Sequence, residues 1–281
     1  MNFFELLSKI KKSLRPLILY SLLNRIPLVV FSKLSKEYIR QILINLADVV
    51  YFRDVYFLKK DLFSKDNVNE LINAEIIEDM SNRYTIVGYI NNFQELTDFK
   101  DLLSFIIGIK KVKEEKLEIS THLPYLELNF DGNSVNVNLY GLNTKDLDLK
   151  FEENVLNKID NETNKSLDDI SYLLKTQLKI YRIAQNSDVF VRTMDIERER
   201  EIIKYTILQN EIQKFISASE KIYMLLRKAH QFMEIDHNLD IKIKEKDIIE
   251  PIEYNEASIK RILTFIETNW RNNLSKYILL K

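Results

Sequence analysis

The sequence predicts an α+β protein. A mixed α/β domain with a β-meander is expected in residues 1–151, and an antiparallel helical hairpin or bundle in residues 152–281. Two observations predict this class. Segments that alternate apolar and polar residues occur before residue 151, and long apolar stripes at helical spacing occur after it. Gly and Pro number only four each, which favours helices over tight turns.

Residues 2–24 are predicted to form an amphipathic helix that is kinked or restarted at Pro16. We expect its apolar face to dock on the domain rather than on a membrane surface, because most such faces are core faces. The apolar run 17–31 is interrupted by polar residues and a proline, so no transmembrane segment is predicted. The basic side chains of this helix are Lys9, Lys11, Lys12 and Arg15.

A strand at 26–31, a helix at 35–48 capped by Ser35, and a strand at 49–58 follow. Strand, helix and strand at this spacing indicate a βαβ unit, although a helix followed by a hairpin fits the same pattern.

Residues 64–90 predict a short helix and then a β-hairpin, an order that resembles the end of a winged-helix module. The hairpin is expected to pair residues 75–79 with 84–87 around a turn that contains Arg83. Between Ser64 and Asp79 there are five acidic residues and one lysine, a charge opposite to that needed for DNA binding. A protein-binding or structural role is therefore favoured for this segment.

A helix is predicted at 92–107, and a β-meander at 117–151. The stretches 125–130 and 135–140 alternate in polarity around Asp131-Gly132, a strong hairpin signal. A third strand is expected at 147–151. One face of this meander is polar throughout, so the sheet should be covered on one side only.

The Asn-rich segment 152–165 is predicted to be the linker between the domains, and a helix follows at 166–185. The longest helical pattern spans 195–233, and its inward positions follow alternating steps of four and three, as in a helix packed against another helix. Residues 234–255 are predicted to be non-helical with a strand at 241–244, and a last helix at 256–280. The inward positions of the long helix are Ile212, Ile216, Ser219, Tyr223, Leu226, His230 and Met233.

Few residues suggest chemistry. The chain has no Cys, so thiolate nucleophiles and Cys-based zinc sites are excluded. The four glycines are too far apart for a phosphate-binding loop. A His, Glu and His set at helical spacing is a candidate metal site, namely His230, Glu234 and His237. Because His230 lies on the apolar stripe, a packed histidine is favoured, and no cofactor or catalytic residue is predicted.

Charge is unevenly distributed. Residues 1–40 carry eight Lys or Arg and two acids, whereas residues 41–151 carry twelve and eighteen. We expect a non-enzymatic, cytoplasmic interaction or assembly subunit with a protein partner or a second copy. The alternative is a nucleic-acid-associated protein that uses the basic N-terminal helix and the wing-like hairpin, with Lys9, Lys11, Lys12, Arg15 and Arg83 as contacts.

Overall fold

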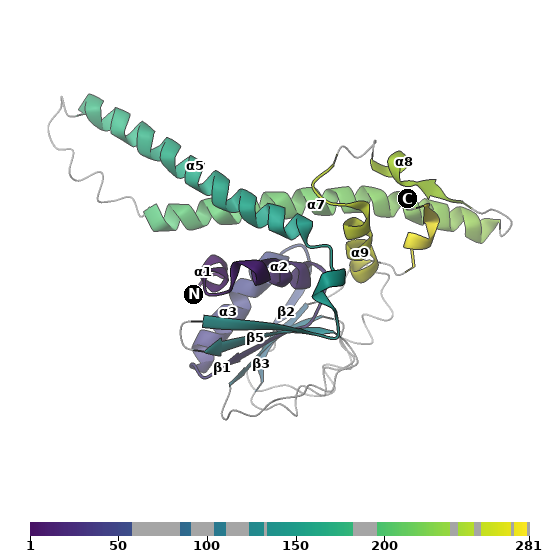
Figure 1. Cartoon of the computed structure of the whole chain (residues 1–281), viewed down its shortest axis with the longest axis horizontal. Coiled ribbons are helices and arrows are strands. Elements are labelled where there is room, and N and C mark those ends of the chain that lie inside the picture. The colour runs from purple at the N-terminus through teal and green to yellow at the C-terminus, as the bar shows by residue number, and fades with distance from the viewer. Residues whose placement is uncertain are drawn as a thin grey trace.

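Six strands form one sheet, and several helices pack beside it, so the chain is an α+β protein (Figure 1). The structure is a computed structural model. It describes residues 1–57, 85–90, 104–110, 124–131, 134–181, 196–236, 241–249, 254–270 and 273–279.

The sheet has the strand order β2-β3-β4-β1-β5-β6. Its first five strands in this order are parallel, and β6 runs antiparallel to β5 as the predicted hairpin. A parallel sheet of this kind differs from the predicted β-meander, since only β5 and β6 are joined as a hairpin. The strands span Leu28–Ser32 (β1), Val55–Phe57 (β2), Thr85–Ile90 (β3), Phe105–Lys110 (β4), Tyr125–Asp131 (β5) and Ser134–Tyr140 (β6).

The predicted βαβ unit is present, but its two strands are not neighbours. The chain leaves β1, passes through α3 (Lys36–Ala47) and enters β2 at the edge of the sheet. Strands β3 and β4 lie between β1 and β2. The Ser35 side chain accepts a hydrogen bond from the Tyr38 amide and caps α3, as predicted. The first part of the predicted strand 49–58 is instead a 3-10 helix, Asp48–Val50.

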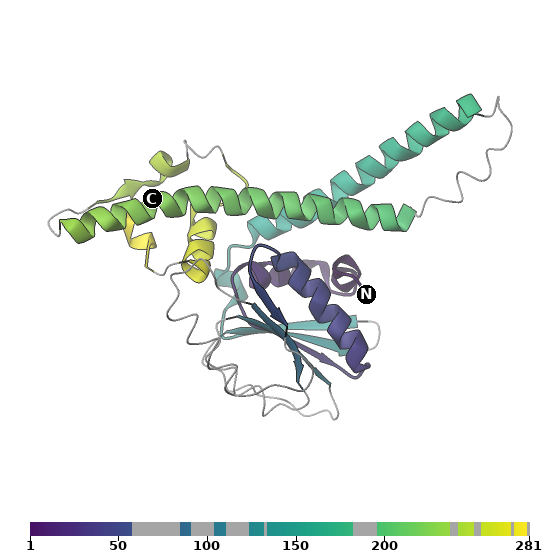
Figure 2. The ribbon, with the colours of Figure 1, turned by 180° about the vertical axis from the view of Figure 1, so that it is seen from behind.

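Three N-terminal helices belong to the same apolar core as one face of the sheet (Figures 1 and 2). The close approach of α3 requires Gly108 on β4, because a Cβ there would lie 2.3 Å from Cγ2 of Ile39. On the other face, β1 and β4 also present buried side chains, including Val29 and Ile107. The predicted polar, solvent-facing side is present on β6, where Asn136 and Asn138 are exposed, whereas Glu127 on the neighbouring β5 is buried.

The N-terminal segment is two helices, and the second restarts at Arg15 and Pro16, which is one of the two predicted outcomes. Helix α1 (Phe3–Ser8) begins with a capping box between Asn2 and Glu5, and a 3-10 turn at Lys12–Leu14 precedes α2 (Arg15–Leu23). Every residue of α2 from Pro16 onward is buried, so this helix is a core element and not an amphipathic one. The docking of this segment on the domain was predicted.

Three sequence predictions in the first domain are wrong. Thr85–Ile90 is an internal strand paired in parallel with β2 and β4, so it is not the returning strand of an exposed wing. Phe105–Ile107 lies in strand β4 rather than in a helix. Residues 147–151 form no third strand, because α5 begins at Lys150. The predicted short helix and Arg83 within 64–84 lie outside the described residues.

The predicted linker 152–165 is also wrong, because it lies inside α5 (Lys150–Tyr181). Long helix α7 (Ile196–Ile235) agrees with the prediction at 195–233. The last predicted helix, 256–280, ends early: α9 spans Ile259–Asn269, and Asn273 adopts a left-handed φ of 64° before a 3-10 turn. The remaining elements are β7 (Ile243–Lys244), α8 (Glu245–Ile249), the 3-10 helix Ser275–Tyr277 and β8 (Ile278–Leu279), and β7 and β8 pair in parallel.

Helix α7 runs along the whole molecule and contacts each part in turn (Figures 1 and 2). Its Tyr205 ring lies 5.0 Å from the ring of Phe4 on α1. Farther along, Glu211 accepts a hydrogen bond from Lys158 on α5, and the Phe215 ring meets Phe265 on α9 at 5.0 Å. The buried side of α7 therefore packs against several successive elements rather than against a single partner helix.

Candidate functional site

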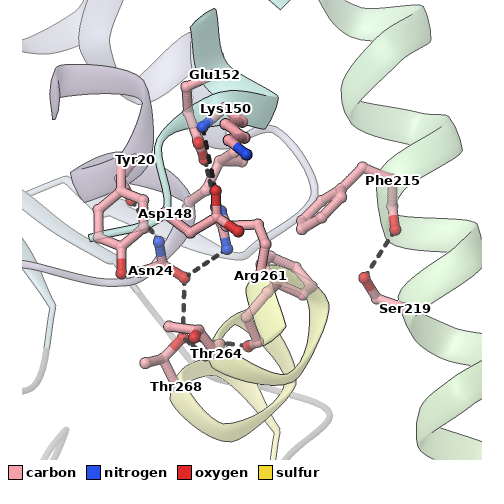
Figure 3. Close-up of polar contacts among 12 residues, drawn as sticks. Tyr20, Asn24, Asp148, Lys150, Glu152, Phe215, Ser219, Arg261, Thr264 and Thr268 are labelled. Atoms are coloured by element: carbon pink, nitrogen blue, oxygen red, sulfur yellow. Dashed lines mark hydrogen bonds and ion pairs between the residues drawn. The ribbon is translucent and has the colours of Figure 1, made fainter. Parts of the chain in front are cut away.

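A buried polar cluster joins the sheet domain to the C-terminal helices (Figure 3). At its centre Arg261 of α9 donates to the same carboxylate oxygen of Glu152, from Nε at 2.9 Å and from Nη2 at 2.5 Å. The two side chains are 1% and 0% exposed. A charge pair this deep has to be well bonded, because each ion loses its hydration on burial.

The C-terminal end of α2 completes the cluster. Asn24 accepts a hydrogen bond from Arg261 Nη1 at 3.1 Å, and its own amide donates to the Tyr20 carbonyl. Asn269 of α9 donates to the Leu23 carbonyl. The chain turns sharply after these residues, with Arg25 at a φ of 59°. Asn269 of α9 and Arg53, which donates to the Leu22 and Leu23 carbonyls, thus satisfy the C-terminal end of a buried helix.

Aromatic rings surround the Arg261 guanidinium. Its Cζ lies 4.8 Å from the ring centroid of Tyr20 and 5.0 Å from that of Phe215, within the range of cation–π attraction. Burial raises the pKa of Glu152, and the charge and hydrogen bonds of Arg261 act in the opposite direction. Burial likewise raises the pKa of Tyr20. The arrangement is that of a structural anchor, since the guanidinium of Arg261 and one carboxylate oxygen of Glu152 bond to each other and not to a ligand.

A second feature is the outward side of α7 near its C-terminal end. Phe232 and Ile235 are 57% and 82% exposed, and Met224 is 51% exposed. At 100° per residue these positions fall on one side of the helix, opposite the buried Leu226. We call this surface the outer stripe and define it as Lys221, Met224, Leu225, Lys228, Phe232 and Ile235, all of which are exposed.

The candidate metal ligands are only partly brought together. Both ring nitrogens of His230 have partners: Nδ1 lies 2.6 Å from the Tyr277 hydroxyl, and Nε2 lies 2.8 Å from Glu234 Oε1. His237 lies outside the described residues. Among the residues that the structure describes, no group of three or more potential ligands could hold a metal ion.

The basic N-terminal residues lie beside acidic ones. Lys12 and Arg15 line a groove of about 390 Å³ whose other wall, on α5, carries Glu153 and Asp160. The Arg15 side chain also bonds the backbone of its own segment, because its Nε donates to the Ile10 carbonyl at 3.1 Å. A surface of mixed charge attracts phosphates less than a basic one does. The other proposed contacts, Lys9 and Lys11, belong to the segment between α1 and α2.

The carboxyl end of β1 is the place where an open parallel sheet usually binds a ligand, because the strand order reverses there. In the described part of this edge, the loop Ser32–Ser35 contains no glycine. Ser32 Oγ accepts from the Leu34 amide at 3.1 Å, and Ser35 Oγ accepts from the Tyr38 amide at 3.3 Å. Both hydroxyl oxygens therefore accept hydrogen bonds from nearby backbone amides.

No known protein family, curated protein or solved structure matches the chain significantly. None of the described helices is long and apolar enough to span a membrane. The sequence did not predict the Arg261 cluster, because its members lie far apart in the chain. The outer stripe had a local signal, the apolar residues opposite the predicted inward positions.

Proposed function

We propose that this protein is a non-enzymatic interaction or assembly subunit, and that the outer stripe of α7 is the surface that binds another protein. In this proposal α5 and α7 act as an antiparallel helical hairpin that presents the stripe away from the sheet domain. The observation that carries the proposal is the exposure of Met224, Phe232 and Ile235 on one side of a helix whose other side is already buried.

A helix that is apolar on all sides is normally buried on all sides. Over its last three turns α7 carries apolar residues on two sides, because Leu226 and Ala229 are buried in the molecule while Phe232 and Ile235 project outward. Contiguous exposed apolar residues bordered by polar ones are typical of protein-binding surfaces. Lys221 and Lys228 provide the polar border and would add electrostatic selection of the partner.

Rigid attachment of α7 supports the same role. The helix is held to α5 by Glu211, which accepts a hydrogen bond from Lys158, and by Phe215, which stacks on Phe151 at 4.4 Å. A recognition helix that is fixed before binding loses little conformational entropy when the partner arrives. The Arg261 cluster would then keep the stripe in a constant orientation relative to the sheet domain.

The test is a comparison of partners captured from the native source by the tagged wild-type chain and by the double variant Phe232→Glu/Ile235→Glu. Quantitative mass spectrometry should find at least one protein that the wild type retains and the variant loses. Leu34→Ser is the matched control, because it removes a partly exposed leucine from the sheet domain. This control should retain the same protein.

Folding must be shown to be intact in each variant, and the thermal unfolding midpoint is expected to change little because both substituted side chains are largely exposed. If the wild-type and the Phe232→Glu/Ile235→Glu chains capture identical sets of proteins, the outer stripe is not the binding surface and the proposal is wrong.

A further inference from the structure

We propose that the groove between α2 and α5 binds a small zwitterion, namely a free amino acid with an apolar side chain. This site is separate from the outer stripe of α7 and does not depend on the proposed function. The groove, called here the α2–α5 groove, has a volume of about 390 Å³, which is large enough for a ligand of this size.

Each wall of the α2–α5 groove comes from one short segment. One wall is the start of α2 and the 3-10 turn before it, which contribute Lys12, Arg15 and Pro16. The other wall is the first part of α5, which packs against α2 (Figure 1). Its lining positions recur at steps of three or four and therefore share one face of the helix. They are Glu153, Leu156, Asn157 and Asp160.

The charges on the two walls are opposite and do not neutralise each other. Lys12 and Arg15 are cations, whereas Glu153 and Asp160 are anions. Within the described part of the chain, none of these four side chains forms an ion pair. The charged groups of opposite walls are therefore more than 4.0 Å apart, and a molecule that carries both charges can contact the two walls at once.

The Arg15 guanidinium is fixed on its wall by the backbone. Its Nε donates to the Ile10 carbonyl at 3.1 Å, and its Nη2 donates to the Ser8 carbonyl at 3.5 Å. These bonds hold the positive charge beside the first turn of α2, whose N-terminus has no side-chain cap. The charge of Arg15 and the positive end of the helix dipole act together here, so this wall is where the carboxylate of the ligand binds.

The remaining lining residues define the other parts of the ligand. Glu153 and Asp160 lie about 10 Å apart along α5, at about 1.5 Å per residue, so a single ammonium group contacts one of them. The apolar lining consists of Pro16, which is buried, and Leu156, which is partly buried. An amino acid with an apolar side chain carries a carboxylate, an ammonium and an apolar group, and each of the three has a counterpart in the groove.

The test measures binding of L-leucine, L-methionine and L-phenylalanine to the full chain by isothermal titration calorimetry. At least one of them should bind with a Kd below roughly 1 mM. The N-acetyl form of that amino acid lacks the ammonium group, and its amide lacks the carboxylate. Each of these two forms should bind at least roughly tenfold more weakly, because each can form an ion pair with only one wall.

Two variants remove one charge from each wall. Lys12→Gln and Asp160→Asn should each raise the Kd at least roughly fivefold, and their folds should be retained because both side chains are exposed. Lys145→Gln and Asp131→Asn are the matched controls, because they make the same exchanges at exposed positions outside the groove. Both controls should keep the Kd within roughly twofold of the wild-type value. Circular dichroism checks the helix content of all four variants.

Three results would overturn the proposal. The first is the absence of measurable heat for all three amino acids at about 10 mM. The second is an N-acetyl form or an amide that binds as tightly as the free amino acid, since the groove would then recognise one charge and not a zwitterion. The third is wild-type affinity in Lys12→Gln and Asp160→Asn, which would place the binding elsewhere on the molecule.

Discussion

Arg261 and Glu152 form a buried ion pair between residues 109 positions apart, in which Nε and Nη2 of the arginine share one carboxylate oxygen. Glu152 lies in the first turn of α5, and Arg261 lies on α9. Asn24 at the end of α2 accepts a third hydrogen bond from the same guanidinium. A single side chain thus fixes three helices relative to one another, so its replacement should destabilise the whole molecule.

Replacing Arg261 by Met should lower the free energy of unfolding by about 3–5 kcal/mol, because the Glu152 carboxylate would stay buried without a counter-charge. Urea denaturation at neutral pH measures this loss. The double variant Arg261→Met/Glu152→Leu should recover most of it, since an apolar pair needs no compensation. A loss below about 1 kcal/mol in the single variant would mean that water reaches the carboxylate and that the cluster is not an anchor.

Two phenylalanines on α7 should behave oppositely. Phe215 is fully buried between Phe151 and Phe265, so Phe215→Ala should reduce stability by about 3–5 kcal/mol. Phe232 is 57% exposed, and Phe232→Ala should change stability by less than about 0.5 kcal/mol. The same denaturation assay measures both. Comparable losses at the two positions would show that the outer stripe is covered within the monomer.

Glu211 should make the protein sensitive to acid. Burial acts to raise the pKa of this carboxyl, but hydrogen bonds and charges from Lys214 and Lys158 outweigh burial and lower the pKa below 4.5. A folded-state pKa below the unfolded value stabilises the protein above about pH 4.5, and this contribution disappears as the pH falls through the folded-state pKa.

The free energy of unfolding should therefore fall less steeply between about pH 5 and pH 3 in Glu211→Gln than in the wild type. Glu162→Gln is the matched control, because it removes a half-exposed carboxylate 3.8 Å from the same Lys158. Its acid profile should follow that of the wild type. Parallel profiles for all three proteins would show that the Glu211 ion pairs contribute nothing to acid stability.

Local patterns predicted the long helix and the hairpin well. The inward positions Ile212, Ile216, Ser219 and Leu226 of α7 are buried and Tyr223 is partly buried, because a helical period repeated over 40 residues has no competing interpretation. Ser35 and Tyr38 form the predicted cap for a similar reason, since a cap involves neighbours in sequence.

Predictions from the sequence were least accurate where apolar residues follow one another without interruption. Phe105–Ile109 is apolar except for Gly108, as a strand buried on both faces should be, and it also satisfies a helical period. In α5 the high content of Asn hid the stripe of Val155, Ile159 and Thr163 at steps of four. The Arg261 cluster had no local signal at all, because its partners meet only after the chain has folded.

The histidine set at the end of α7 gives a last test. In the neutral ring the Tyr277 hydroxyl donates to Nδ1 of His230, and Nε2 donates to Glu234. A metal ion at His230 would have to displace one of these partners, and Tyr277 is 3% exposed. Adding Zn²⁺ should therefore shift the thermal unfolding midpoint by less than about 1 °C. Tyr277→Phe should cost about 1 kcal/mol of stability through the lost hydrogen bond. A Zn²⁺-dependent rise in the midpoint that disappears in His237→Ala would show instead that His230, Glu234 and His237 bind a metal.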